Sequence, residues 1–225
     1  MIPQMKIVIQ CAGSKNQARP GAGFRATDNR QIKFVAHPNL APHSETYAYA
    51  RPDDLFNGSH TWREQLLEYN KGDRANLLHL LPAYQLYAGK AYQNLVKKFG
   101  TEQVFILSAG WGLIPADFLT PDYDITFSQA ENVAAHCRRK KSDNYADMCL
   151  LPDDGDNIIF LGGKDYLPLF CQMTANLKGR KKVFFNAASD LYLGPGFSTE
   201  RFETDRRTNW HYDCAQMLID GRVGF

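Results

Sequence analysis

The chain has 225 residues, of which 44% are hydrophobic and 22% are charged, and its formal net charge is +2. This is the composition of an ordinary globular protein, long enough for one large domain, which we take to span residues 1–225. The charge is too small to indicate a nucleic-acid-binding protein by itself. No apolar run approaches the roughly 18 residues that span a bilayer, so we expect no membrane partner.

The cysteines and the N-terminal sequence predict where in the cell the protein is found. Five cysteines are scattered without a close CxxC pair, and the start of the chain lacks the cationic and apolar regions of a signal peptide. We therefore expect a reduced, cytoplasmic protein. The histidines form no HExxH motif, and GAGF at Gly21 lacks the third glycine of a dinucleotide fingerprint. We expect no metal site and no tightly bound cofactor.

The N-terminal quarter begins with a strand and continues irregularly. MKIVIQ, residues 5–10, predicts a strand that ends in the small-residue turn CAGSK. Residues 16–60 are rich in Pro, Gly, Asn and Asp and predict a long insertion, in which IKFVA and TYAYA could pair as a hairpin. The insertion would suit either a lid over a ligand or a hairpin packed on the core. The residues that fit both interpretations are Phe24, Arg25, Tyr47, Tyr49 and Arg51.

The rest of the chain alternates between helices and strands. A helix is predicted from about His60, capped near Ser59 or Thr61, followed by helical stretches over 74–89, interrupted at Pro82, and over 90–99, ending at Gly100. Strands are predicted at 103–109, 157–163 and 181–187, with helices at 128–141 and 164–177 between them. This order predicts an α/β fold, a mostly parallel sheet flanked by helices with a long irregular N-terminal insertion.

Three loops leave the carboxyl ends of predicted parallel strands, where such folds bind ligands. They are CAGSK (11–15), SAGWGL (108–113) and GGKDY (162–166). In the first, the amides of Gly13 and Ser14 could bind a phosphate or a base edge beside Lys15, or the segment could be a plain turn. Cys11 could be a nucleophile, but a buried small hydrophobic residue is the favoured interpretation.

The second loop continues as far as Asp124. Gly110 and Gly112 allow close approach of a ligand after Ser108, and Trp111 could stack on a base for about 1–3 kcal/mol or fill the core. Asp124, beside Tyr123, could act as a general base or stabilise an oxocarbenium ion, or could form an Asx turn.

The third loop and the basic clusters could complete a binding site. Gly163, Lys164 and Asp165 at a helix start would form a third wall of the pocket, or a simple turn. Basic clusters at 138–141 and 178–182 could contact phosphates or be solvated faces. The candidate phosphate contacts are Arg138, Arg139, Lys140, Lys141, Arg180 and Lys181.

Two segments carry a resemblance to known families. YAGKAYQNL (87–95) followed by SAGWGLIPADFLTPDYDITF (108–127) resembles the YaaA peroxide-stress family and its relatives, and with CAGSK it is similar to the uracil-glycosylase-like domain of archaeosine synthases. The resemblance covers about residues 7–15 and 77–166. The matching positions are Cys11, Lys15, Trp111, Gly112, Leu113, Pro115, Tyr123 and Asp124.

The resemblance implies a nucleic-acid or nucleoside partner. The YaaA family is associated with DNA binding and protection from oxidative damage, and the archaeosine relatives act on a deazaguanine base in tRNA. The Cys-Ala-Gly-Ser-Lys turn departs from the archaeosine pattern of Pro-Cys-Ser, so the specific chemistry of that family does not carry over.

Two hypotheses of different class follow. In the first, the protein holds a modified or damaged base of DNA, RNA or a nucleotide and cleaves or exchanges its N-glycosidic bond, with Asp124 as the leading carboxylate. In the second, it is a DNA-binding protein of the peroxide-stress type without catalysis.

Overall fold

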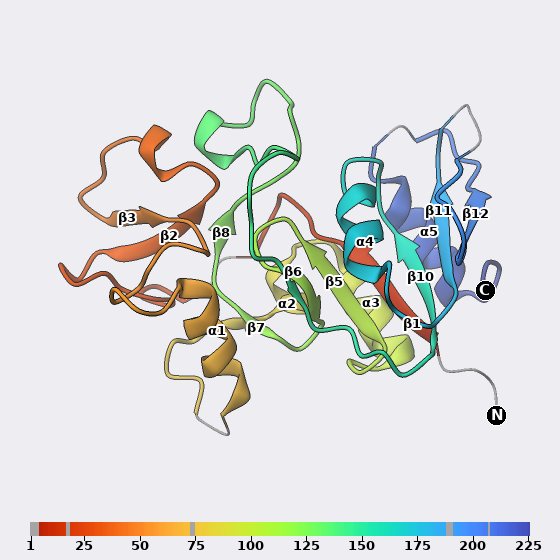
Figure 1. The fold of residues 1–225 in the computed structure, drawn as a ribbon, viewed down its shortest axis with the longest axis horizontal. Coiled ribbons are helices and arrows are strands. Elements are labelled where there is room, and N and C mark those ends of the chain that lie inside the picture. Colours follow the sequence, from red (N-terminus) through yellow and green to blue (C-terminus); the bar gives the residue numbers. More distant parts are fainter. Residues whose placement is uncertain (1–4, 17–18, 73–74, 188–190, 207) are drawn as a thin grey trace.

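The computed structural model describes residues 5–16, 19–72, 75–187, 191–206 and 208–225. A seven-stranded sheet, in the order β12-β11-β10-β1-β5-β6-β9, forms its centre (Figure 1). The five strands from β12 to β5 are parallel, and β6 runs antiparallel to β5. The predicted α/β fold with a mostly parallel sheet is confirmed. The strands are β1 (Met5–Gln10), β5 (Val104–Ser108), β6 (Gly112–Pro115), β9 (Met148–Cys149), β10 (Asn157–Leu161), β11 (Lys181–Phe185) and β12 (Phe197–Arg201).

The central strands are buried on both faces. Ile7, Val8 and Ile9 of β1 are inaccessible to solvent, and every residue of β5 is buried. Near-continuous apolar runs of this kind are expected where helices cover both faces of a parallel sheet. The hydrophobic effect of these strands therefore fixes the middle of the sheet.

Helices lie on both faces of the sheet. Figure 1 shows α4 (Leu167–Thr174) on the near face and α3 (Lys90–Phe99) and α5 (Trp210–Ile219) on the far face. Phe170 of α4 stacks on Phe160 of β10 with ring centroids 4.4 Å apart. No helix in the described residues is long and apolar enough to cross a bilayer.

Helix α1 (Trp62–Lys71) begins where the sequence predicts. Thr61 and Glu64 form a capping box, in which each side chain accepts a hydrogen bond from the other residue's backbone N–H. Such a cap satisfies N–H groups that the first turn cannot pair internally. The end of α3 is also as predicted, because Gly100 follows it with a φ of +86°.

The insertion forms a second, small sheet. Strand β2 (Gln31–Val35) pairs in parallel with β3 (Tyr47–Ala50) and with β8 (Tyr123–Asp124), which belongs to the loop after β6. The predicted hairpin is therefore wrong. The connection from β2 to β3 contains the 3-10 helix η1 (Pro38–Leu40) and is long enough for a parallel crossover, which a tight turn does not allow.

Residues 75–80 are not helical. The Asn76 side chain accepts from the N–H of Leu80 and donates to its carbonyl, and His79 adopts a positive φ of 48°. These side-chain bonds replace helical ones, as Asn commonly does in turns. A short pair of strands, β4 (Leu81–Pro82) and β7 (Leu119–Thr120), and the one-turn α2 (Ala83–Leu86) follow. Residue 74, the first of the predicted helical stretch, lies outside the described part.

The helix predicted over 128–141 is also absent, although every residue of that segment is described. It contains only the 3-10 helix η2 (Ala135–Cys137). The Ser128 hydroxyl accepts from the N–H of Ala130, and the Arg138 guanidinium donates to the carbonyls of Ala130, Glu131 and Val133. Those carbonyls would be paired within a helix, so the arginine stabilises a segment of turns instead.

We predict that Gly112→Ala destabilises the sheet by about 2 kcal/mol or more, because Gly112 has a φ of +91° and an added Cβ would lie 2.3 Å from the Met148 carbonyl oxygen. Chemical denaturation would measure the loss. Gly13→Ala is the control, since no atom lies within 4 Å of its Cβ position, and it should change stability by about 0.5 kcal/mol or less. Equal stability of the two variants would contradict this account of β6.

Candidate functional site

The three predicted loops meet at one edge of the sheet. Strands β1, β5 and β10 are parallel neighbours, so their carboxyl ends lie together. The N–H of Gly163 donates to Gln10 Oε1 at 2.6 Å, and the Tyr166 hydroxyl lies 3.2 Å from Cys11 Sγ. The N–H of Ala109 points at the same sulfur from 3.4 Å. The first and third loops, and the start of the second at Ala109, therefore lie together at this edge.

A cleft of about 1130 Å³ opens at this edge. Its walls are formed by residues 10–14 after β1, by 162–167 between β10 and α4, and by 183–187 at the end of β11. The start of α5, residues 208–212, forms a further wall, and polar side chains of 126–132 face the same space. The cleft thus combines backbone turns, helix starts and aromatic side chains.

Six of the predicted substrate-binding residues line this cleft. They come from the first and third loops. They are Cys11, Gly13, Ser14, Gly163, Lys164 and Asp165. Cys11 is 3% exposed at the cleft floor, in keeping with the buried interpretation, whereas Ser14, Lys164 and Asp165 are exposed.

The second loop does not reach the cleft. Trp111 is inaccessible to solvent and packs edge-to-face on Phe34 of β2, with ring centroids 5.0 Å apart. It fills the core and is not a face for a base. Gly110 and Gly112 are buried beside it, and the Ser108 hydroxyl accepts from the N–H groups of Gly110 and Trp111. The role of these residues is to hold the turn between β5 and β6.

Tyr123 belongs to a buried chain of hydroxyl groups. Its hydroxyl lies 2.8 Å from the hydroxyl of Tyr87 and accepts from Ser108 Oγ at 2.8 Å. Burial raises the pKa of Tyr123 and of Tyr87 well above the ordinary value of a phenol. Both phenols are therefore protonated at neutral pH and enclosed by protein.

Asp124 and Lys15 form contacts outside the cleft. Asp124 Oδ2 lies 2.7 Å from Lys33 Nζ of β2, and its side chain is 38% exposed. Lys15 Nζ lies 4.3 Å from the centre of the Tyr123 ring. Neither residue lines the cleft, although Lys15 of the first loop lies over the ring of Tyr123, the neighbour of Asp124.

Two buried arginines hold the turn after β5 by its carbonyl groups. Arg63 of α1 donates to the carbonyls of Gly110 and Trp111, each at 3.0 Å, and pairs with Asp53. Arg139 donates to the carbonyl of Ala109 at 2.7 Å. It also pairs with Asp147 through two hydrogen bonds. Arg139 is only 5% exposed because it makes these contacts inside the protein.

The predicted phosphate contacts are only partly available. Arg139 and Lys181 are buried, and Lys181 donates to the carbonyl of Leu177 while burial lowers its pKa. Arg138 is bonded to loop carbonyls. Lys140, Lys141 and Arg180 are exposed, but Arg180 precedes β11, at the opposite end of that strand from the cleft.

The contacts of its described residues show that the insertion packs on the core. Phe24 is 6% exposed and lies against Trp62 of α1, and Arg51 donates to the carbonyl of Asn144. None of the described residues of 16–60 lines the cleft. The interpretation as a packed structural unit is therefore favoured over a lid.

The sequence patterns do not indicate the C-terminal wall of the cleft. They predict neither strand β12 nor helix α5 and assign no role to His211. His211 is 3% exposed, and within the described residues its Nε2 has no hydrogen-bond partner. Burial lowers its pKa to about 4, so the ring is neutral at pH 7. The helical spacing of Trp210, Cys214 and Leu218 after Asn209 could have indicated α5.

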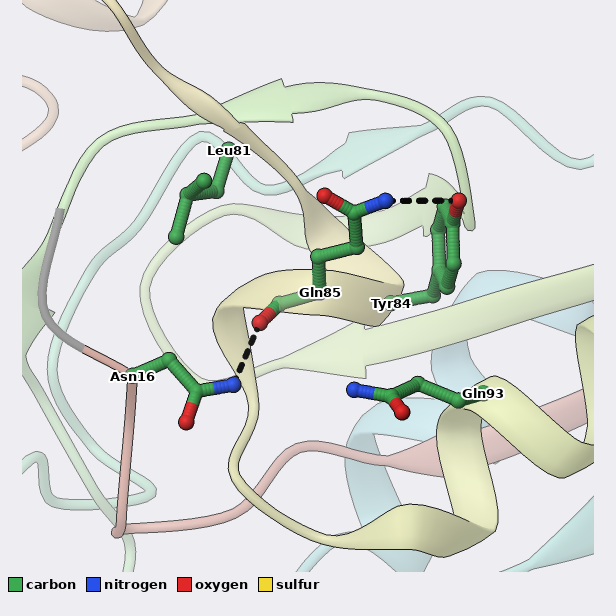
Figure 2. Close-up of a pocket in the computed structure, with 5 residues that line it drawn as sticks. All are labelled: Asn16, Leu81, Tyr84, Gln85 and Gln93. Carbon is green, nitrogen blue, oxygen red and sulfur yellow. Dashed lines mark hydrogen bonds between the residues drawn. The ribbon is translucent and has the colours of Figure 1, made fainter.

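A second, shallower pocket of about 520 Å³ lies between α2 and α3 (Figure 2). Asn16 donates to the carbonyl of Gln85 at 2.7 Å, and the Gln85 amide donates to the Tyr84 hydroxyl at 2.8 Å. Leu81 and Gln93 complete the lining. Two of its three side-chain amides are already hydrogen-bonded within the pocket, and none of its lining residues belongs to the three loops.

Comparisons with protein-family models, with curated proteins and with solved structures find no match to this chain. In the described ranges, no group of three His, Cys, Asp or Glu side chains is placed to hold a metal ion. The argument for function therefore depends on the cleft itself.

We predict that Arg139→Met destabilises the protein by about 3 kcal/mol, because it leaves Asp147 and the Ala109 carbonyl without their buried partner. Lys140→Met removes an exposed neighbouring charge and should change stability by about 0.5 kcal/mol or less. Denaturant unfolding of both variants provides the measurement. Equal stability of the two variants would show that Arg139 does not hold the turn after β5.

Proposed function

We propose that the cleft binds the base of a nucleoside, a nucleotide or a nucleic-acid strand. The observation that supports this most directly is the composition of the cleft walls at the carboxyl edge of the parallel strands. Aromatic residues Tyr166, Trp210 and Tyr212 lie beside backbone turns and amide side chains. This edge is where open α/β sheets bind their ligands.

The lining fits the two faces of a base. Bases are flat and bind to aromatic side chains by stacking, while their edges carry hydrogen-bond donors and acceptors. Hydroxyl and amide groups come from Ser14, Thr126, Asn132 and Asn186. The half-buried Tyr212 offers the aromatic ring, whereas Tyr166 and Trp210 are buried and shape the wall. Its volume of about 1130 Å³ exceeds what a single base requires and leaves room for the sugar.

We further propose that the protein cleaves or exchanges an N-glycosidic bond. The reaction class comes from the resemblance of residues 7–15 and 77–166 to base-processing families. Hydrolysis adds water to C1′, breaks the bond between C1′ and the base nitrogen, and releases the base with a proton. A carboxylate would orient the water and stabilise the cationic sugar. Asp165 lines the cleft, whereas Asp124 is paired with Lys33, so we assign this role to Asp165.

The first test is product analysis. The protein is incubated with purine nucleosides, single- and double-stranded DNA and tRNA, and released bases are measured by mass spectrometry. Binding without any product would instead favour the non-catalytic DNA-binding alternative. Absence of both binding and product across this panel would overturn the proposal.

We predict that Asp165→Asn lowers the rate of base release by about 100-fold or more, since it removes the carboxylate that acts on the water. Asp124→Asn is the matched control and should keep near wild-type turnover, because its carboxylate lies outside the cleft. Rates of product formation at saturating substrate, with thermal unfolding as a check of folding, provide the comparison. Loss of turnover in Asp124→Asn alone would show that the leading carboxylate is Asp124 and that Asp165 is misassigned.

A further inference from the structure

Gln10 lies where the connections of the sheet change from one face to the other. It is the last residue of β1, whose neighbours in the sheet are β5 and β10. The connection from β1 to β5 ends with α3 on the far face, whereas α4, which follows β10, lies on the near face (Figure 1). Connections that leave adjacent parallel strands on opposite faces open a crevice at the strand ends, and open α/β sheets bind their ligands there.

The side chain of Gln10 is held in one orientation across this crevice. Its Oε1 accepts a hydrogen bond from the N–H of Gly163 at 2.6 Å. The opposite orientation of the amide would place a donor against this N–H and leave it without an acceptor, which is costly for a partly buried group. The amide therefore keeps its oxygen on Gly163 and directs its nitrogen away from that residue.

The amide nitrogen of Gln10 is a donor that the described part of the chain leaves unused. Nε2 makes no hydrogen bond to a described residue, and it is not one of the fully enclosed side-chain atoms that lack a partner. The half-buried Gln10 lines the cleft, so the accessible surface of this nitrogen faces the space for a ligand. An amide nitrogen carries two N–H groups and can only donate.

A chain of hydroxyl groups fixes the backbone of the same residue. The Tyr92 hydroxyl donates to the carbonyl of Gln10 at 2.8 Å and lies 3.3 Å from the hydroxyl of Tyr212. Because Tyr92 has one hydroxyl hydrogen, Tyr212 is the donor in the second contact. The half-buried Tyr212 ring is thus two hydrogen bonds away from Gln10, and both residues line the cleft.

We propose that Gln10 determines which bases the cleft accepts, by donating from Nε2 to an oxo group on the edge of the base. An unconstrained glutamine can read adenine with both its oxygen and its nitrogen. Here the oxygen is already bonded to Gly163, so the amide presents chiefly its donor, and an amino group on the base would place two donors face to face. The cleft therefore prefers oxo bases to amino bases, an inference that rests on the proposed function for the class of ligand.

The test uses pairs of bases that carry an oxo or an amino group at the same ring position. Inosine and adenosine form the pair at C6, and uridine and cytidine form the pair at C4. Each is titrated by calorimetry as the nucleoside and within a short single strand. In a pair that binds, we expect the oxo base to bind at least tenfold more tightly than the amino base.

Two variants attribute this preference to Gln10. Gln10→Glu keeps an oxygen for the N–H of Gly163 and replaces the donor by an acceptor, so the preference should fall at least tenfold and shift towards the amino base. Gln10→Met removes both polar groups and should abolish the preference. Gln93→Glu, the same change at an exposed site on α3 outside the cleft, is the control and should keep the wild-type preference. Thermal unfolding checks that each variant is folded.

The outcomes separate this inference from the proposed function. Equal affinity for the two members of each pair, or tighter binding of the amino base, would overturn the role of Gln10 and leave the base-binding cleft intact. No binding of any of the four bases in either form would overturn the proposed function and the inference with it. A preference for oxo bases that persists in Gln10→Glu and in Gln10→Met would show that another group discriminates, and would overturn the inference.

Discussion

The turn after β5 depends on two buried ion pairs. Arg63 and Arg139 reach it from opposite parts of the chain and bind three successive carbonyl groups, of Ala109, Gly110 and Trp111. Buried charges are costly unless they are paired, and Asp53 and Asp147 provide the pairing. The insertion, α1 and the segment after η2 are thereby fixed to the sheet through one turn.

This constraint divides the molecule into a packed side and an open side. On the packed side, Trp111 and Phe34 join the small sheet to the core, and Tyr123 is enclosed with Tyr87. On the open side, the loops after β1 and β10 are joined by Gln10 and end in the cleft, with α5 opposite them. Arg139 connects the two sides, because its backbone N–H donates to the carbonyl of Thr126, which lines the cleft.

The sequence predicts the regular parts of this fold better than its site. The apolar runs of β1, β5, β10 and β11 and the Thr61 cap follow from local patterns and are confirmed. The pairing of β2 with β8, and the burial of Trp111 and Arg139, follow from long-range contacts that no local pattern encodes. The first and third loops reach the cleft because both end parallel strands. The second loop turns back as β6, because Gly112 with its positive φ allows an antiparallel return. Helix α5 follows an irregular segment, and its local sequence pattern predicts a helix only weakly.

The central claim is that ligands bind at the sheet edge between the first and third loops and the start of α5. The most direct measurement is a map of backbone amide chemical shifts of ¹⁵N-labelled protein during titration with purine nucleosides and nucleotides. The account predicts that the largest changes fall on Gly13, Gly163 and Tyr212. Changes confined to Gln85 and Gln93 of the shallow pocket, or to the exposed Lys140 and Arg180, would contradict it.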